Sequence, residues 1–353
     1  MSALRLSTVA GPPELCAGAP MQLRVTADLV GEPPLHTWAH GEEQKGRLDF
    51  EDLRLSTSHG KLKAEDGTIV VPNTGLDLLG RDVVVEVSST HAPGQTGRLR
   101  LKPHFGCGVS LDFRGDHANP GTPGAAGRDG RDGRDEQSSP SYAKPGGHGV
   151  SGEPGGDGGQ GGHGGHGRHV TVDIGKLRGP DDTVLVLVRI AGKNEGASRT
   201  VLVDPARGGG VVLDAGGGDG GQGGHGGIGG RGGSGGTGKP AGDGANGGPG
   251  GRGGSGGDGG DGGTVVVRYD AGHPDLQGVV QVHNPGGAGG ARGSAGGGGS
   301  GGNAFSGGRQ GESGSRGQEG AGAGRDGRDG PPAVPQAVPR GTLFPDAATL
   351  GLF

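Results

Sequence analysis

Runs of glycine with one side chain at every third position constrain this chain more than any other feature. Residues 216–238 read GGGDGGQGGHGGIGGRGGSGGTG, and 94 of the 353 residues are glycine. Glycine loses more conformational freedom on folding than any other residue and has no side chain to bury. Such runs must therefore stay disordered or be held by contacts of the backbone itself.

An extended helix of the polyproline-II type offers these backbone contacts. It has three residues per turn, a rise of about 3.1 Å per residue and no internal hydrogen bonds. In a Gly-Gly-X repeat the X side chains line one edge, so neighbouring helices approach along the glycine edges and exchange backbone hydrogen bonds. The X residues of 216–238 are almost all polar, which suits an outward edge. We therefore expect a bundle of polyglycine-II helices.

Short β-branched runs directly follow several glycine runs, as in GGHGRHVTVDI and GGDGGTVVVRY. This alternation predicts that residues 145–330 form one folded body of polyglycine-II helices with interleaved β-strands. The segment GGDGGQGGHGG occurs at 155–165 and again at 217–227, which indicates a repeat of stacked units.

The glycine runs resemble those of polyglycine-II bundle proteins such as springtail antifreeze proteins and phage fibre-tip adhesins. The resemblance covers roughly residues 145–330 and rests on GGDGGQGGHGG, GGIGGRGGSGG and GGRGGSGGDGGDGG. It implies the bundle architecture, although those proteins have mostly short turns where this chain has β-runs. A collagen-like trimeric fibre is the alternative, because the GRDGRDG tracts at 127–133 and 324–330 keep glycine at every third position.

The remaining parts of the chain have a different composition. Residues 1–115 contain short alternating runs with turn signals between them and predict an immunoglobulin-like β-sandwich, with Trp38 between Cys16 and Cys107. Residues 116–144 are expected to be a Gly/Pro/Arg/Asp linker, and 331–353 a Pro-rich spacer followed by an apolar tail. The whole chain is thus expected to be all-β.

Charge and hydropathy limit the partners of the chain. The formal net charge is −5 with both signs interspersed, so we expect no nucleic-acid partner. No apolar run approaches the ~20 residues of a membrane span. The N-terminus lacks the apolar core of a signal peptide, so a cytoplasmic location or a non-classical export route is expected. Cys16 and Cys107 could pair or remain free thiols.

Candidate chemistry is sparse. No catalytic constellation stands out, so we expect no enzyme activity and no cofactor. His163 and His225 occupy the same place in the two identical segments and are a candidate metal pair, with solvated edge residues as the alternative.

Binding residues are predicted at loop tips and in the tail. The tip candidates are Lys239, Asp243, Asn246, Asn303, Phe305 and Arg309. The tail candidates, which dock on a partner or fold back onto the chain itself, are Leu343, Phe344, Leu350, Leu352 and Phe353.

We expect a non-enzymatic structural or binding protein that is a rigid spacer or adhesin-like tip for a protein partner or surface receptor. The sandwich or the tail would anchor it, and homo-oligomers are possible. The alternatives are an ice-binding protein and a collagen-like trimer.

Overall fold

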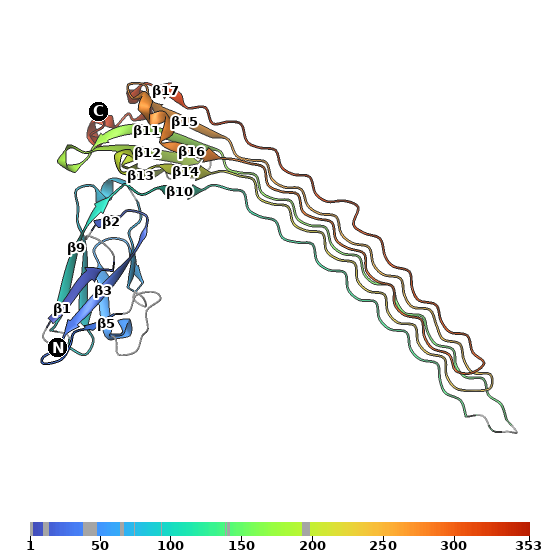
Figure 1. The fold of residues 1–353 in the computed structure, drawn as a ribbon. Coiled ribbons are helices and arrows are strands. Elements are labelled where there is room, and N and C mark those ends of the chain that lie inside the picture. Colours follow the sequence, from blue (N-terminus) through green and yellow to red (C-terminus); the bar gives the residue numbers. More distant parts are fainter. Residues whose placement is uncertain are drawn as a thin grey trace.

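The computed structural model has two β bodies and one long arm (Figure 1). It describes residues 3–9, 14–37, 48–63, 67–73, 75–92, 94–137, 139, 142–192 and 198–353. Trp38 lies outside these residues. The described chain is mostly strand or extended backbone, with two short α-helices near the C-terminus, so the all-β class is confirmed. No helix within the described ranges is long and apolar enough to cross a bilayer.

The N-terminal body consists of two β-sheets that share a core. Val83, Val85 and Val87 alternate with exposed or half-buried residues along β8 (Val83–Ser89), which places one face of the strand inward. One sheet has the order β1 (Ala3–Thr8), β3 (Pro20–Asp28), β7 (Thr68–Val70), β6 (Lys61–Lys63), with β4 (Leu35–His36) also on β3. The other has the order β2 (Glu14–Cys16), β9 (Thr96–His104), β8 (Val83–Ser89), β5 (Leu53–Thr57). The short 3-10 helices η1 (Phe50–Asp52) and η2 (Gly75–Leu78) precede β5 and β8.

The second body also has two sheets around one core. Its inward residues include Val172, Val188 and Leu213. The larger sheet has the order β13 (Arg199–Val203), β12 (Val184–Gly192), β11 (Val170–Arg178), β15 (Val265–Asp270), β17 (Gln336–Val338). The smaller sheet is parallel and has the order β10 (Val109–Asp112), β14 (Val211–Asp214), β16 (Val280–His283). Three 3-10 helices, η3 (Pro180–Asp182), η4 (Pro205–Arg207) and η5 (Pro274–Gly278), connect strands.

The two bodies are joined by apolar packing and by specific polar contacts. Leu15 and Leu101 of the first body share a buried cluster with Leu202 of the second. The Asn73 amide donates to the Leu202 carbonyl at 2.7 Å and accepts from the Leu202 N–H at 3.1 Å. Cys16 and Cys107 form a disulfide, which ties the connection between the bodies to β2.

The arm contains six extended glycine-rich runs, all continuous with strands of the second body (Figure 1). Runs 1, 3 and 5 lead outward from β10, β14 and β16, and runs 2, 4 and 6 return toward β11, β15 and β17. In chain order the six runs cover residues 114–137, 143–169, 215–238, 241–264, 284–303 and 309–331.

Backbone hydrogen bonds connect the runs at every third residue. In run 3, the N–H groups of Gly218, Gly221 and Gly224 donate to carbonyls of run 2 at 2.8–2.9 Å. The N–H groups of Gly217, Gly220 and Gly223 donate to carbonyls of run 5. Carbonyls of run 3 also accept N–H groups of runs 1 and 4. The outward runs bond in parallel in the order 1–3–5 and the returning runs in the order 2–4–6. The arm is therefore a two-layered lattice.

Glycine is required where two runs approach. A Cβ atom at Gly257 would lie 1.8 Å from the carbonyl oxygen of Gly162, and one at Gly227 would lie 1.9 Å from that of Ala125. Real Cβ atoms do not come this close to backbone. The glycines of the lattice therefore leave room for a neighbouring chain.

The ends of the glycine region differ from the predicted boundaries. Residues 116–137 are part of run 1, because Gly121, Gly124 and Gly127 donate to run 3 at 2.7 Å, so the tract is not a linker. The predicted spacer ends in β17, which extends the larger sheet beside β15. Backbone hydrogen bonding, which composition does not reveal, includes both segments in the fold.

Candidate binding site at the tip of the arm

The far end of the arm carries two exposed aromatic rings. Tyr142 is 62% exposed and Phe305 is 53% exposed, and no other Tyr, Phe or Trp within the described residues is exposed. Tyr142 lies directly before run 2, after run 1 has turned back, and Phe305 lies between runs 5 and 6. Figure 1 shows that these turns are at the end of the arm away from the β bodies. Exposed aromatic side chains are typical anchors of binding surfaces.

The turn at Tyr142 also carries a cation. The Lys144 ammonium lies 5.6 Å from the centre of the Tyr142 ring and 3.7 Å from a Glu136 carboxylate oxygen. The Lys144 carbonyl accepts the Lys239 N–H at 2.8 Å, which connects this turn to the turn between runs 3 and 4. The two turns thus support each other through the backbone.

The turn at Phe305 has a defined conformation. The Gly308 N–H donates to the Phe305 carbonyl at 2.9 Å, and Gly307 has a φ of +97°, which favours glycine over any residue with a side chain. The following Arg309 N–H donates to the Asp243 carboxylate at 2.7 Å. Phe305 is therefore presented by a short turn that is fixed to run 4.

The structure brings together only some of the predicted tip residues. Lys239 and Phe305 lie in turns, and Asn303 and Arg309 lie beside the Phe305 turn. Asp243 and Asn246 differ from the prediction, because they belong to run 4 and their side chains accept the N–H groups of Arg309 and Glu312. Tyr142 and Lys144 were missed. The signal was present in the sequence, since SSPSYAK interrupts two glycine runs.

Charged groups of both signs lie near the tip, and Lys144 pairs with Glu136 there. Lys239 and Arg309 add to Lys144, whereas the Asp135 carboxylate accepts from the N–H and the hydroxyl of Thr237 at 2.7 and 2.9 Å. These hydrogen bonds from Thr237 lower the pKa of Asp135. The carboxylates near the tip are thus largely used within the arm.

The predicted histidine pair is not brought together. The Nδ1 atom of His163 in run 2 accepts the Asp258 N–H of run 4 at 3.1 Å, and Nδ1 of His225 in run 3 accepts the Ser294 N–H of run 5 at 3.3 Å. The two residues lie in different layers, and the antiparallel register of runs 2 and 3 separates them by two triplets. Each histidine instead completes the lattice with a side-chain hydrogen bond. Within the described ranges, Cys16, His104 and Cys107 are the one group of three or more with metal-ligand spacing, and its two sulfurs form the disulfide.

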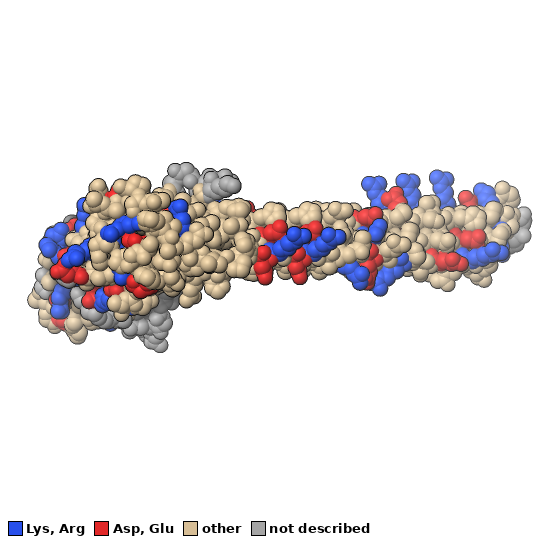
Figure 2. Space-filling view, turned by 90° about the horizontal axis from the view of Figure 1, so that it is seen from above, with Lys and Arg blue, Asp and Glu red and all other residues tan. Residues whose placement is uncertain are grey.

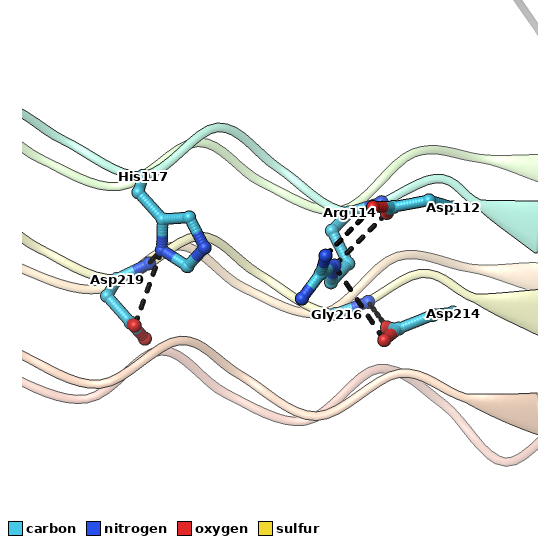
Figure 3. A network of polar contacts seen from close by, with 6 residues as sticks. All are labelled: Asp112, Arg114, His117, Asp214, Gly216 and Asp219. Atoms are coloured by element: carbon cyan, nitrogen blue, oxygen red, sulfur yellow. Dashed lines mark hydrogen bonds and ion pairs between the residues drawn. The ribbon is translucent and has the colours of Figure 1, made fainter. Parts of the chain in front are cut away.

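Polar side chains also connect the runs where the arm leaves the second body (Figure 3). Arg114 donates to both carboxylate oxygens of Asp112 at 3.1 and 2.8 Å and lies 3.7 Å from Asp214. The Arg114 side chain lowers the pKa of Asp112 to about 2. One triplet further out, the Asp219 N–H donates to Nδ1 of His117 at 3.1 Å. Figure 2 shows acidic and basic residues interleaved along the arm.

The predicted docking tail is buried within the chain. The tail folds into α1 (Arg340–Leu343) and α2 (Ala347–Leu350), and Leu343, Phe344 and Leu352 are buried in the cluster shared by the two bodies. Leu350 and Phe353 are half-buried, and the His273 ring bonds the Phe353 carbonyl at 2.9 Å. The tail is therefore folded back onto the chain and is not a free docking peptide, because burying its apolar side chains within the chain is favourable.

Comparison with known proteins gives no relative: no family model, no curated protein and no solved structure matches this chain.

Proposed function

We propose that this protein is a non-enzymatic structural and binding protein that presents an aromatic, basic tip at the end of a stiff arm. The observation that carries the proposal is the placement of Tyr142 and Phe305, the exposed aromatic residues of the described chain, in turns at the far end of the arm. Neither ring belongs to a buried hydrophobic cluster, and aromatic residues dominate the energetics of many interfaces.

We infer that the arm is a polyglycine-II bundle and that the N-terminal body is an immunoglobulin-like sandwich. The hydrogen bonds at every third residue and the near contact of neighbouring backbones support the first inference. The two sheets with a common core support the second. With a rise of about 3.1 Å per residue, each run would span roughly 70 Å.

The arm acts as a spacer in this proposal. Its runs bond to one another within one chain, which supports an intrachain bundle over a collagen-like trimer. Because the C-terminal tail is buried, the N-terminal body is the anchor on the larger assembly. The partner is a protein or surface receptor with an acidic, partly apolar patch, since Lys144 lies over the Tyr142 ring, Lys239 is bonded to the Lys144 carbonyl, and Arg309 follows the Phe305 turn.

Site-specific photocrosslinking in the producing cells tests the proposal. A photoreactive benzoylphenylalanine at position 305 is compared with the same group at position 228, where Ile228 is 62% exposed in the middle of run 3. We expect a discrete crosslinked product from position 305 that competes with unlabelled protein, and none from position 228. Equal products from both positions, or none from position 305, would contradict a tip-directed binding function.

A further inference from the structure

We propose that the cleft between the two β bodies is a binding site for a small anion attached to an apolar group. The cleft has a volume of about 260 Å³, close to the lower end of the roughly 300–1,000 Å³ of ligand pockets, which often lie between domains. Its walls come from the turn before β8 and the end of β9 on one side, and from η3, β12 and η4 on the other. A ligand here would contact both bodies at once.

The inner part of the cleft is apolar. Leu78 and Phe105 of the first body and Leu185 of the second line it, and all three side chains are buried. Pro103 and Pro180 extend the same surface. This lining suits a ring or a short hydrocarbon, which gains free energy by leaving water.

The rim of the cleft carries basic side chains. Arg81, Lys102, His104 and Arg207 line it, against the two carboxylates of Asp82 and Asp204. The carboxylate of the buried Asp204 caps η4 by accepting the Ala206 N–H at 3.1 Å, and the Asp204 backbone N–H donates to the Phe105 carbonyl at 2.8 Å. Three cationic side chains, Arg81, Lys102 and Arg207, thus face two carboxylates in the lining, which favours a negatively charged ligand.

Two of the basic groups are positioned to take an anion. Arg81 is exposed, and within the described residues no hydrogen bond or ion pair uses its guanidinium. Arg207 pairs with Glu14 at 3.0 Å, but both side chains are well exposed, so the pair is weak and can exchange for a ligand. An arginine fork suits the oxygens of a carboxylate or a phosphate.

The test is a titration of the whole protein with phenyl phosphate as the probe. Inorganic phosphate and benzyl alcohol are matched controls for the charge and the ring, and calorimetry at fixed ionic strength gives each Kd. We expect one saturable site for phenyl phosphate, with a Kd about 10-fold or more below that of either control. Equal affinity for inorganic phosphate, equal affinity for benzyl alcohol, or no saturable binding would each overturn the proposal.

Substitutions at the cleft test whether phenyl phosphate binds there. Arg81→Gln and Arg207→Gln are each expected to weaken phenyl phosphate binding about 10-fold, because each removes a charged donor. Arg54→Gln is the control, since Arg54 is an exposed arginine of β5 that does not line this cleft. A loss of affinity in Arg54→Gln equal to that in Arg81→Gln would show charge screening alone and would overturn the assignment.

Discussion

His148, His163 and His166 each accept a backbone N–H of run 4 through Nδ1, at 3.1, 3.1 and 2.9 Å. Several X residues donate their N–H to an Asp, His or Asn side chain one run away, as the Arg252 N–H does to Asp157 at 2.7 Å. Asn246 does so for Glu312 at 2.9 Å. At the scale of residues, the polar side chains of the arm are therefore part of its hydrogen-bond lattice.

Replacing one of these acceptors tests its role. We expect His163→Ala to lower the free energy of unfolding by about 1 kcal/mol, because the Asp258 N–H loses its partner. His163→Asn should retain most of the stability, since an amide oxygen can accept as Asn246 does. Amide hydrogen exchange at Asp258 checks the cause: it should accelerate in the alanine variant alone. Equal exchange in both variants would contradict a specific role of this acceptor.

Glycine positions in the arm differ sharply in how well they tolerate replacement by alanine. We expect Gly257→Ala to destabilise the protein by about 1–3 kcal/mol or more, because the new Cβ would meet the Gly162 carbonyl oxygen at 1.8 Å. Gly297→Ala is the matched control, since nothing lies within 4 Å of its Cβ position. Thermal unfolding of the two variants should separate them clearly. A tolerated Gly257→Ala would show that the runs are not packed this closely.

The pKa of Asp112 predicts a pH dependence at the root of the arm. Its folded-state pKa of about 2 lies below the ordinary value of 3.8, so the stabilisation by ionised Asp112 is present above pH 3.8 and is lost as the pH falls toward 2. In Arg114→Ala the pKa should rise toward 3.8 without reaching it, because the backbone N–H of residue 114 still donates to Asp112. Carboxyl NMR titration measures both values. Asp135, whose bonds are to Thr237, should titrate unchanged, and a shift there would indicate a wider rearrangement.

At the scale of elements, the sheets of the second body and the runs of the arm share one register. Val109 lies opposite Val211 in the parallel pair β10 and β14. The hydrogen bond from the Arg231 backbone N–H to the Asp129 carboxylate has the same sequence separation of 102. Likewise Val170 lies opposite Val265, and run 2 pairs with run 4 at the same separation of 95. The strands therefore fix which triplets of the arm meet.

The C-terminal segment is the element with the largest predicted effect on stability. Phe344 is fully buried, and its ring lies under the Arg189 guanidinium at 4.9 Å. Phe344→Ala should lower the free energy of unfolding by about 3–5 kcal/mol, as for other large core residues. The exposed Phe305 is the matched control, and Phe305→Ala should change stability by less than about 0.5 kcal/mol. Urea unfolding of both variants decides whether the tail belongs to the core.

At the scale of the whole molecule, the arm gives the protein a strongly elongated shape (Figure 1). We expect size-exclusion chromatography with light scattering to give a mass near 34.3 kDa, and small-angle scattering on the same peak to give an elongated profile. This result follows because all bonds between runs lie within one chain. A threefold mass with a rod-like profile would mean that runs assemble between chains.

The sequence by itself determined the local structure of this protein. Two glycines in every three residues leave a folded chain only backbone against backbone as its packing, and the β-branched runs beside them become strands. The predicted all-β class and the position of Phe305 in a turn follow from these local patterns. The sequence also left the cysteines open, and their proximity became visible only when β2 and the end of β9 were paired.

Only the tertiary structure decided which runs meet and what their side chains do. Every Gly-Gly-X triplet has the same local preference, so the repeat at 155–165 and 217–227 does not set a register, and the strands of the second body do so instead. For the same reason His163 and His225 occupy equivalent positions in the sequence but different layers in the arm. The fate of Phe344 and the inclusion of residues 116–137 likewise depend on distant partners, because burial and backbone pairing are properties of the assembled chain.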